Sequence, residues 1–211
     1  MTKAVLWDFG GVILSSPFDA FRRYEAEHGL TTDFIRGVNT TNPHANAWAL
    51  LERGEITADQ FDVVFADESS ELGHRVRGAD VLELLGGDIR PEMVVMLDRV
   101  KQAGYKVACL TNNVLGGDGE RVGEDARSVA VAAIMGRFDV VVESSKVGVR
   151  KPEPRFYEIA CEMLGVRPEE CIFLDDLGIN LKPAATMGMI TIKVTSASQA
   201  IVDLGAALGW N

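Results

Sequence analysis

The chain has 211 residues, of which 47% are hydrophobic and 25% charged, and its formal net charge at pH 7 is −10. This composition is that of an ordinary globular protein, long enough to bury roughly 70% of the surface that its unfolded chain exposes. The negative charge repels phosphate backbones and anionic lipids, so nucleic acids and membranes are disfavoured as partners.

The cysteines and the start of the chain predict a cytoplasmic protein. Cys109, Cys161 and Cys171 form no CxxC pair, and two of them lie in strand-like apolar runs, where inert buried thiols are common. No window approaches the length of an apolar membrane span, and the first residues do not resemble a signal peptide. We expect a reducing compartment, whereas no pattern indicates the oligomeric state.

The first predicted element is a strand at 4–9 (AVLWDF), which carries Asp8 onto a Phe-Gly-Gly turn. Residues 16–88 then contain no strand-like run. They contain amphipathic patterns at about 18–28, 31–37, 46–53 and 58–66, and Thr57 and Gln60 make a capping box before the last of these. We predict that 16–88 is an inserted helical cap over the carboxyl end of the first strand, where open α/β sheets bind ligands.

Strands and helices alternate along the rest of the chain. The predicted strands lie at 106–113, 138–144, 171–176 and 189–194, and the predicted helices at about 91–103, 119–133, 153–164 and 178–187. The strands are continuous apolar runs, which indicates burial on both faces. The expected fold class is α/β, with 1–15 and 89–211 forming a doubly wound parallel sheet core.

Polar clusters follow four of these strands and predict a single site. In chain order they are Asp8, then Thr111-Asn112-Asn113, then Lys151, then Asp175-Asp176. Each cluster alone has a structural interpretation, because such residues also cap helices and form turns. However, the carboxyl ends of parallel strands meet at one edge of a sheet, so the four clusters are expected to converge.

The residue types of this site fit phosphoryl transfer. An Asp8 carboxylate can attack phosphorus to give an aspartyl phosphate, which divides a difficult hydrolysis into two easier steps. Mg²⁺ prefers oxygen ligands, which Asp8 with Asp175 or Asp176 can supply. The Thr111 hydroxyl and the Lys151 ammonium can neutralise the oxygens of the transferring group.

At these residues the chain resembles the haloacid dehalogenase-like hydrolases. The segments LTNN, FDVVVESSKVGVRKPEPRFYEIA and IFLDDLGINLKPAATMGMITIKV are similar to the phosphatase-type domains fused to soluble epoxide hydrolase and to certain acyl-CoA dehydrogenases. The resemblance implies a Rossmann-like core, a helical cap after the first strand and Mg²⁺-dependent hydrolysis of a small phosphorylated metabolite. It places Asp8 in the nucleophile motif, Thr111 in the second, Lys151 in the third and Asp175-Asp176 in the fourth.

The resemblance also implies finer roles. Asp176 is the expected direct metal ligand beside Asp8, Asp175 orients it, and the backbone carbonyl of residue 10 completes the protein ligands. Gly10, Thr111, Asn112 and Lys151 are the expected phosphate-binding residues.

One position departs from the family pattern. The residue two after the nucleophile is usually an aspartate that acts as general acid and base, and here it is Gly10. Gly10 keeps the carbonyl ligand but lacks the proton donor, whose contribution is typically 10²–10⁴-fold in rate.

Three interpretations of Gly10 stay open. The enzyme uses a substitute proton carrier, such as water, His44 in the cap, or Ser15 or Ser16 at the cap entrance. Alternatively, it hydrolyses substrates with good leaving groups, such as acyl phosphates. In the third interpretation the chain is a catalytically weakened module that binds a phosphorylated ligand or a partner.

Two other functions are less favoured by the sequence. A metal-independent haloacid dehalogenase would not place the adjacent acids Asp175 and Asp176 beside Asp8, where unpaired carboxylates are costly without a cation. A dinucleotide site in the glycine-containing segment 114–123 is disfavoured because that segment follows TNN and is typical of a loop.

Overall fold

The computed structural model describes residues 1–112 and 126–210, and its centre is a five-stranded parallel sheet. The strands, in chain order, are β1 (Ala4–Trp7), β2 (Lys106–Thr111), β3 (Val140–Glu143), β4 (Cys171–Asp175) and β5 (Ile190–Lys193). Their order across the sheet is β3-β2-β1-β4-β5, and every pairing is parallel. The predicted α/β class is therefore confirmed.

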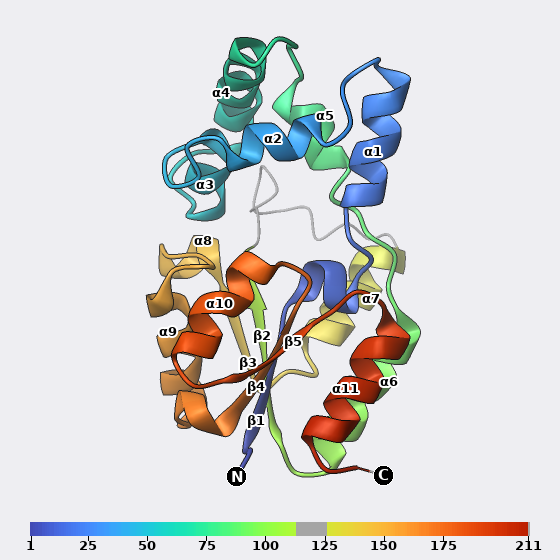
Figure 1. Ribbon diagram of the computed structural model, residues 1–211, viewed down its shortest axis with the longest axis vertical. Helices are drawn as coiled ribbons and strands as arrows, with labels where there is room; N and C mark the ends of the chain where they lie inside the picture. The colour runs from blue at the N-terminus through green and yellow to red at the C-terminus, as the bar shows by residue number, and fades with distance from the viewer. Residues whose placement is uncertain (113–125, 211) are drawn as a thin grey trace.

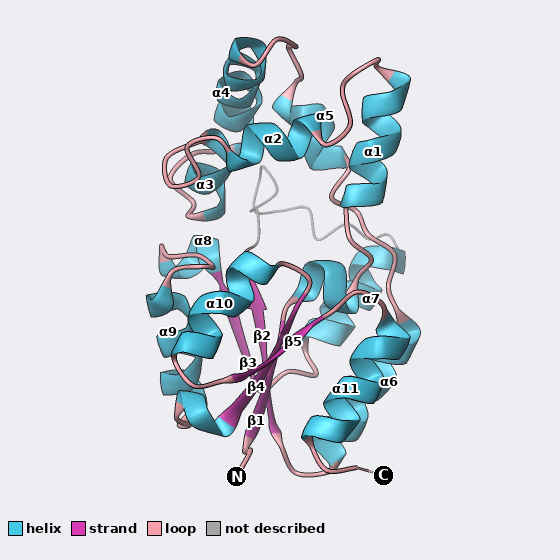
Figure 2. Cartoon of the chain, viewed as in Figure 1, coloured by secondary structure: helices cyan, strands magenta, loops and turns pink. Residues whose placement is uncertain are grey.

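Helices cover both faces of the sheet, as Figures 1 and 2 show. One face packs against α6 (Pro91–Gln102), α7 (Ala126–Met135) and α11 (Ala197–Ala207), and the other against α9 (Pro154–Leu164) and α10 (Gly178–Thr186). Along β1, Val5 and Trp7 lie in the first hydrophobic cluster, whereas Ala4 and Leu6 lie in the second. Because alternate side chains enter opposite layers, a continuous apolar run is what this doubly wound sheet requires.

Five helices form a separate lobe at the carboxyl ends of the strands (Figure 1). They are α1 (Phe18–Glu27), α2 (Phe34–Thr40), α3 (Ala47–Glu52), α4 (Ala58–Glu71) and α5 (Gly78–Glu83). The lobe has its own hydrophobic cluster, in which the rings of Phe61 and Phe65 lie 5.2 Å apart. The capping box of Thr57 and Gln60 at the start of α4 is confirmed.

The chain leaves and re-enters the core along two adjacent segments. Leu14 forms an antiparallel β-bridge with Ile89, and the Ser15 amide donates to the Asp88 carbonyl at 2.8 Å. The Ser15 hydroxyl in turn accepts from the Asp88 amide at 2.9 Å. These contacts hold the two connections side by side, next to the predicted boundaries at residues 15 and 89.

The structure differs from the predicted elements mainly at their ends. Each strand is shorter than its apolar run, and β1 ends at Trp7 because the chain turns at Asp8 into the five-residue helical turn Phe9–Ile13. Three helices of the structure were not among the predicted elements: α5, α8 (Ser144–Val147) and α11. Pro168–Glu170 forms a further 3₁₀ turn before β4. The first residues of the helix predicted at 119–133 lie outside the described residues.

Candidate active site

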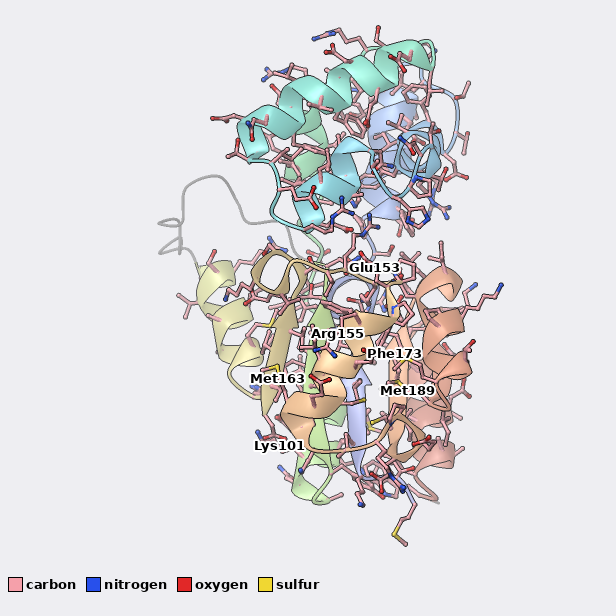
Figure 3. The ribbon with its side chains drawn as sticks, turned by 90° about the vertical axis from the view of Figure 1, so that its left-hand side faces the viewer. Lys101, Glu153, Arg155, Met163, Phe173 and Met189 are labelled. Carbon is pink, nitrogen blue, oxygen red and sulfur yellow. The ribbon has the colours of Figure 1, made fainter. Side chains whose placement is uncertain are left out.

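The structure brings together predicted site residues from three adjacent strands. Asp8 directly follows β1, Thr111 ends β2 and Asp175 ends β4, and β1 lies between the other two strands. Lys151 comes from the segment between α8 and α9. In Figure 3 the labelled Glu153, two residues further on, lies at the end of the core that faces the helical lobe.

Lys151 is the central cation of this cluster. Only 1% of its side chain is exposed, and its Nζ lies 2.8 Å from Asp8 Oδ1 and 2.8 Å from Asp175 Oδ2. Burial by itself lowers the pKa of the Lys151 ammonium, but the carboxylates of Asp175 and Asp8 raise that pKa above its ordinary value. Lys151 is therefore charged and is held beside the proposed nucleophile.

Asp8 is buried and is oriented by the turn that it begins. Its Oδ1 accepts a hydrogen bond at 2.7 Å from the amide of Phe9, the next residue and the first of the turn. Burial raises the pKa of Asp8 well above its usual value; Lys151 lowers that pKa, and Asp175 and Asp176 raise it further. The site thus holds one carboxylate that is positioned by a backbone amide and a lysine.

Three carboxylates of the site lie close enough together to bind one metal ion. Asp8, Asp175 and Asp176 each offer a carboxylate oxygen, and these oxygens all lie within 4.8 Å of one another. Burial, followed by the charge of Asp175, raises the pKa of Asp176 to about 6. An all-oxygen donor set with one lysine for three acids fits Mg²⁺, because the excess negative charge needs a cation.

Asp175 and Asp176 have different surroundings. Asp175 accepts hydrogen bonds from the Leu177 amide at 2.8 Å and from Asn180 Nδ2 at 3.0 and 3.1 Å, in addition to its contact with Lys151. These donors occupy both of its oxygens. The half-buried Asp176 lies beside the Ser16 hydroxyl and its own backbone amide. Among the described residues no side-chain amide holds it as Asn180 holds Asp175, so its carboxylate is the more available of the two for a metal ion.

Gly10 and Gly11 lie in the same turn but have opposite surroundings. Gly10 has φ −69° and ψ 134°, and a Cβ added to it would meet no heavy atom within 4 Å. Gly11 has φ +76°, and an added Cβ would lie 2.3 Å from the Asp176 carboxylate. Gly11 is therefore needed for backbone conformation and for the approach of Asp176, whereas Gly10 adjoins open space.

Thr111 and Asn112 lie next to Lys151 in different ways. Thr111 is buried at the end of β2. The Asn112 side chain binds the main chain of Lys151 twice: Oδ1 accepts from the Lys151 amide at 2.9 Å, and Nδ2 donates to the Lys151 carbonyl at 3.0 Å. Asn113 lies outside the described residues.

Sequence reasoning missed Glu52, a lobe residue that reaches this site. The Glu52 side chain is 8% exposed, and its Oε2 lies 2.7 Å from Arg150 Nε and accepts from Asn112 Nδ2 at 3.2 Å. Burial raises the pKa of Glu52 to about 7, while Arg150 acts to lower it. The available signal was a lone acid in the apolar run NAWALLER, four residues after Trp48.

Asn180 was also missed, although its place in α10 explains its role. The residue is buried, and its amide orients Asp175 from one turn into the helix. A polar residue shortly after the Asp175-Asp176 pair was the only sequence signal for it.

The substitute proton carriers considered for Gly10 have distinct surroundings. His44 is exposed. The Ser15 hydroxyl is engaged with Asp88 between the two connections. Ser16 Oγ is buried beside Asp176, and it makes no hydrogen bond of normal geometry to any residue that the structure describes.

The cysteines and tryptophans singled out in the sequence lie in packed surroundings. The three cysteines are free and buried. Trp7 lies in the core, and Trp48 packs on Phe61 while donating to Glu52 Oε1 at 2.9 Å. The disfavoured dinucleotide segment 114–123 lies outside the described residues. Within 1–112 and 126–210, no helix has both the length and the apolar character needed to cross a membrane.

The fold and site define a Rossmann-like α/β core whose polar residues meet at the carboxyl edge of the parallel sheet. The haloacid dehalogenase-like hydrolase family model matches residues 2–188, and the chain belongs to this family. The recognition made from the sequence motifs is thereby confirmed.

Two curated relatives agree with this assignment, and a solved structure shares the fold. The chain is 33% identical to mouse (Mus musculus) acyl-CoA dehydrogenase family member 10 and 32% identical to mouse bifunctional epoxide hydrolase 2, matching 99% and 98% of this chain. It spans only 19% and 39% of the length of those two proteins. A haloacid dehalogenase family enzyme from Bacteroides thetaiotaomicron, solved with magnesium and inorganic phosphate, has a TM-score of 0.59 at 20% identity, covering 93% of this chain and 96% of that one.

Proposed function

We propose that this hydrolase is a Mg²⁺-dependent phosphatase that cleaves a small phosphorylated metabolite through an aspartyl phosphate on Asp8. The observation that carries the proposal is the pairing of buried Lys151 with both Asp8 and Asp175 beside a third carboxylate. Lysine and a cation together would offset the charge of the acids and of a phosphate group. The magnesium and phosphate in the related bacterial enzyme support the same chemistry.

The proposed first step is attack by Asp8 on phosphorus. A carboxylate oxygen of Asp8 forms a bond to phosphorus, the bond from phosphorus to the leaving oxygen breaks, and the leaving group departs with the electron pair. Lys151 and the Thr111 hydroxyl stabilise the phosphoryl oxygens, and the Asn112 side chain holds the Lys151 main chain. In the second step a water oxygen forms a bond to phosphorus and the bond from Asp8 to phosphorus breaks, so that the free Asp8 carboxylate is regenerated and the phosphate leaves with both protons of the water.

Asp8, Asp176 and the Gly10 carbonyl would hold the magnesium ion, and Asp175 would orient this group through Lys151 and Asn180. When bound, the ion would supply positive charge to the phosphoryl oxygens. The available Asp176 carboxylate supports this division of roles between the adjacent acids.

Gly10 shapes the substrate range that we propose. With no carboxyl group at residue 10, the departing oxygen takes its proton from water or from another nearby donor such as Ser16, or leaves unprotonated. The leaving group of an acyl phosphate is a stable carboxylate, which needs no proton to depart. Acyl phosphates should therefore react faster than alkyl phosphate esters. The proposal also includes a cap formed by residues 16–88 and a cytoplasmic location. The expected partner is a small-molecule substrate rather than a nucleic acid or a membrane.

An activity panel tests this function. Purified protein would be assayed with alkyl phosphate esters, an acyl phosphate and 2-haloacids, each with Mg²⁺ and with a chelator. We expect turnover of the phosphate compounds only with Mg²⁺, and none of the haloacids. Release of halide with chelator present, or stabilisation by phosphate without any turnover, would replace the phosphatase by a dehalogenase or a binding module.

The nucleophile is tested by Asp8→Asn. An amide is a very poor nucleophile, so turnover should fall below about a tenth of the wild-type rate. Asp88→Asn, at the connection between lobe and core, provides a control substitution of the same kind outside the site. Activity above that level in folded Asp8→Asn protein would exclude Asp8 as the nucleophile.

A further inference from the structure

Glu52 connects the helical lobe to the polar residues of the core. It ends α3, and its buried carboxylate extends across to Arg150 and Asn112. Its other oxygen, Oε1, accepts from Trp48 Nε1 at 2.9 Å, one helical turn earlier. Donors therefore contact both oxygens, which suits an ionised carboxylate held in a single position and does not suit a proton donor to the substrate.

Asn112 carries this contact onward to Lys151. Nδ2 of Asn112 is shared between Glu52 Oε2 and the Lys151 carbonyl, and Oδ1 receives the Lys151 amide. The orientation of one amide side chain thus fixes the main chain of Lys151. Lys151 Nζ in turn contacts Asp8 and Asp175, each at 2.8 Å.

Arg150 strengthens the same connection. Its Nε lies 2.7 Å from Glu52 Oε2 and also donates to the Lys151 carbonyl at 3.3 Å, while its Nη1 donates to the Pro43 carbonyl of the lobe at 3.4 Å. The close approach of Gly54 to Ser145, where an added Cβ would lie 3.0 Å from the Ser145 carbonyl oxygen, shows that lobe and core pack tightly at this point. The pair Glu52–Arg150 therefore lies within a packed interface.

We propose that Glu52 is a positioning residue that acts through Asn112 to hold Lys151 against Asp8 while the lobe lies on the core. The inference rests on the proposed function, because it assigns Lys151 a part in phosphoryl transfer. The position of Lys151 beside Asp8 thereby depends on whether the lobe, with Glu52, is packed against the core. No residue of the core replaces the Glu52 contact to Asn112 among the hydrogen bonds of the described residues.

The first experiment measures hydrogen exchange of the Lys151 amide, which reports directly on its bond to Asn112. We expect exchange in Glu52→Ala to be roughly fivefold or more faster than in the wild type, with Glu52→Gln between the two. Glu55→Ala is the matched control, because Glu55 follows three residues later, pairs with Arg53 and is exposed. Its Lys151 amide should exchange as in the wild type.

The second experiment is a double-mutant cycle on kcat. Glu52→Ala should lower kcat about tenfold or more, with a smaller effect on KM, because Lys151 stabilises the transition state. In the Asn112→Ala background the same change should cost less than about twofold, since the connection is already broken. A merely structural role would lower the melting temperature without this loss of additivity.

The outcomes separate this inference from the proposed function. If the wild type hydrolysed no phosphate compound, the phosphatase proposal would fail, yet the exchange experiment would still show whether Glu52 holds Lys151. If the wild type were active but Lys151 exchange were unchanged in both Glu52 variants, the inference would be wrong. Additive effects of Glu52→Ala and Asn112→Ala on kcat would overturn it too. Glu52→Gln keeps the test available if Glu52→Ala does not fold.

Discussion

Gly10 and Gly11 show how two identical residues in one turn serve different purposes. The positive φ of Gly11 and the 2.3 Å approach of Asp176 to its missing Cβ make a side chain there costly. The backbone of Gly10 is ordinary for any residue, and the space next to it is open. The absence of a carboxyl group at residue 10 is therefore not imposed by packing.

This contrast predicts the result of matched alanine substitutions. Gly11→Ala should destabilise the protein by at least about 1 kcal/mol and impair Mg²⁺ binding, because Asp176 must move. Gly10→Ala should leave stability within about 0.5 kcal/mol of the wild type. Denaturant unfolding with and without Mg²⁺ measures both effects, and equal losses in the two variants would contradict the contrast.

Gly10→Asp tests the missing acid and base directly. The variant should fold, since the added Cβ meets nothing within 4 Å. General acid help at even a fraction of its usual size would raise kcat for an alkyl phosphate ester about tenfold, while an acyl phosphate should gain little. The measurement is the ratio of the two rates at saturating Mg²⁺, with Gly10→Asn as the isosteric control. An unchanged ratio would mean that the missing carboxyl group does not limit turnover.

Asp176 is the residue at which the metal assignment is tested. Wild-type protein should gain thermal stability from Mg²⁺, as any ligand that binds only the folded state confers, and Asp176→Asn should lose most of that gain. NaCl at matched ionic strength controls for screening. If both proteins gain equally from Mg²⁺, Asp176 is not a metal ligand.

At the scale of elements, the junction of α3 with the segment between α8 and α9 carries a buried charge. Glu52 faces Arg150, Lys151 lies near enough to lower its pKa further, and Arg53 follows it on the chain. Despite these cations, burial raises the pKa of Glu52 from 4.5 to about 7. The ionised carboxylate is therefore less favourable in the folded protein than in the unfolded chain.

The pH dependence of stability follows from this shift. Below pH 4.5 Glu52 is protonated in both states and contributes no penalty, whereas between pH 4.5 and about 7 only the unfolded chain releases the proton, so the penalty grows and is complete above pH 7. Glutamine at residue 52 stays neutral. The free energy of unfolding of Glu52→Gln minus that of the wild type should therefore rise by on the order of 1–3 kcal/mol as the pH increases from 5 to 8.

Paired unfolding curves of the wild type and Glu52→Gln at these two pH values measure that gain, and other titrating groups cancel in the difference. A difference that stays constant with pH would contradict the raised pKa. If Glu52→Gln is more stable than the wild type but has a lower kcat, the positioning role of Glu52 is separate from any contribution to folding.

At the scale of the whole molecule, three hydrophobic clusters are divided between two units. Two clusters lie on opposite faces of the sheet, and the third lies inside the helical lobe around Phe61 and Phe65. The units are joined by the paired connections at Leu14 and Ile89 and by the polar contacts of Glu52. This arrangement agrees with the proposed division at 16–88, which stays a prediction.

Phe61→Ala tests that division. Removing a fully buried phenylalanine should cost roughly 3–5 kcal/mol within the lobe. If the lobe is a separate cooperative unit, amides in α4 should lose protection from hydrogen exchange while those in β1 and β4 keep theirs. Equal loss of protection in the lobe and in the sheet would mean that the chain unfolds as one unit.

The sequence by itself determined the class of fold and indicated which polar residues lie together, whereas their roles stay predictions. Continuous apolar runs require a sheet buried on both faces, and parallel strands bring their carboxyl ends together, so the proximity of Asp8, Lys151 and Asp175 followed from their order along the chain. The strand ends were less predictable, because a run such as AVLWDF does not show where backbone pairing stops.

Only the tertiary structure decided which groups surround these residues. The contact of Glu52 with Asn112 joins residues 60 positions apart in different units, and no local pattern specifies it. Likewise, the difference between Gly10 and Gly11 depends on where Asp176 lies in space. Local periodicity reports which face of an element is buried, whereas a polar contact across an interface depends on how separately formed elements pack together.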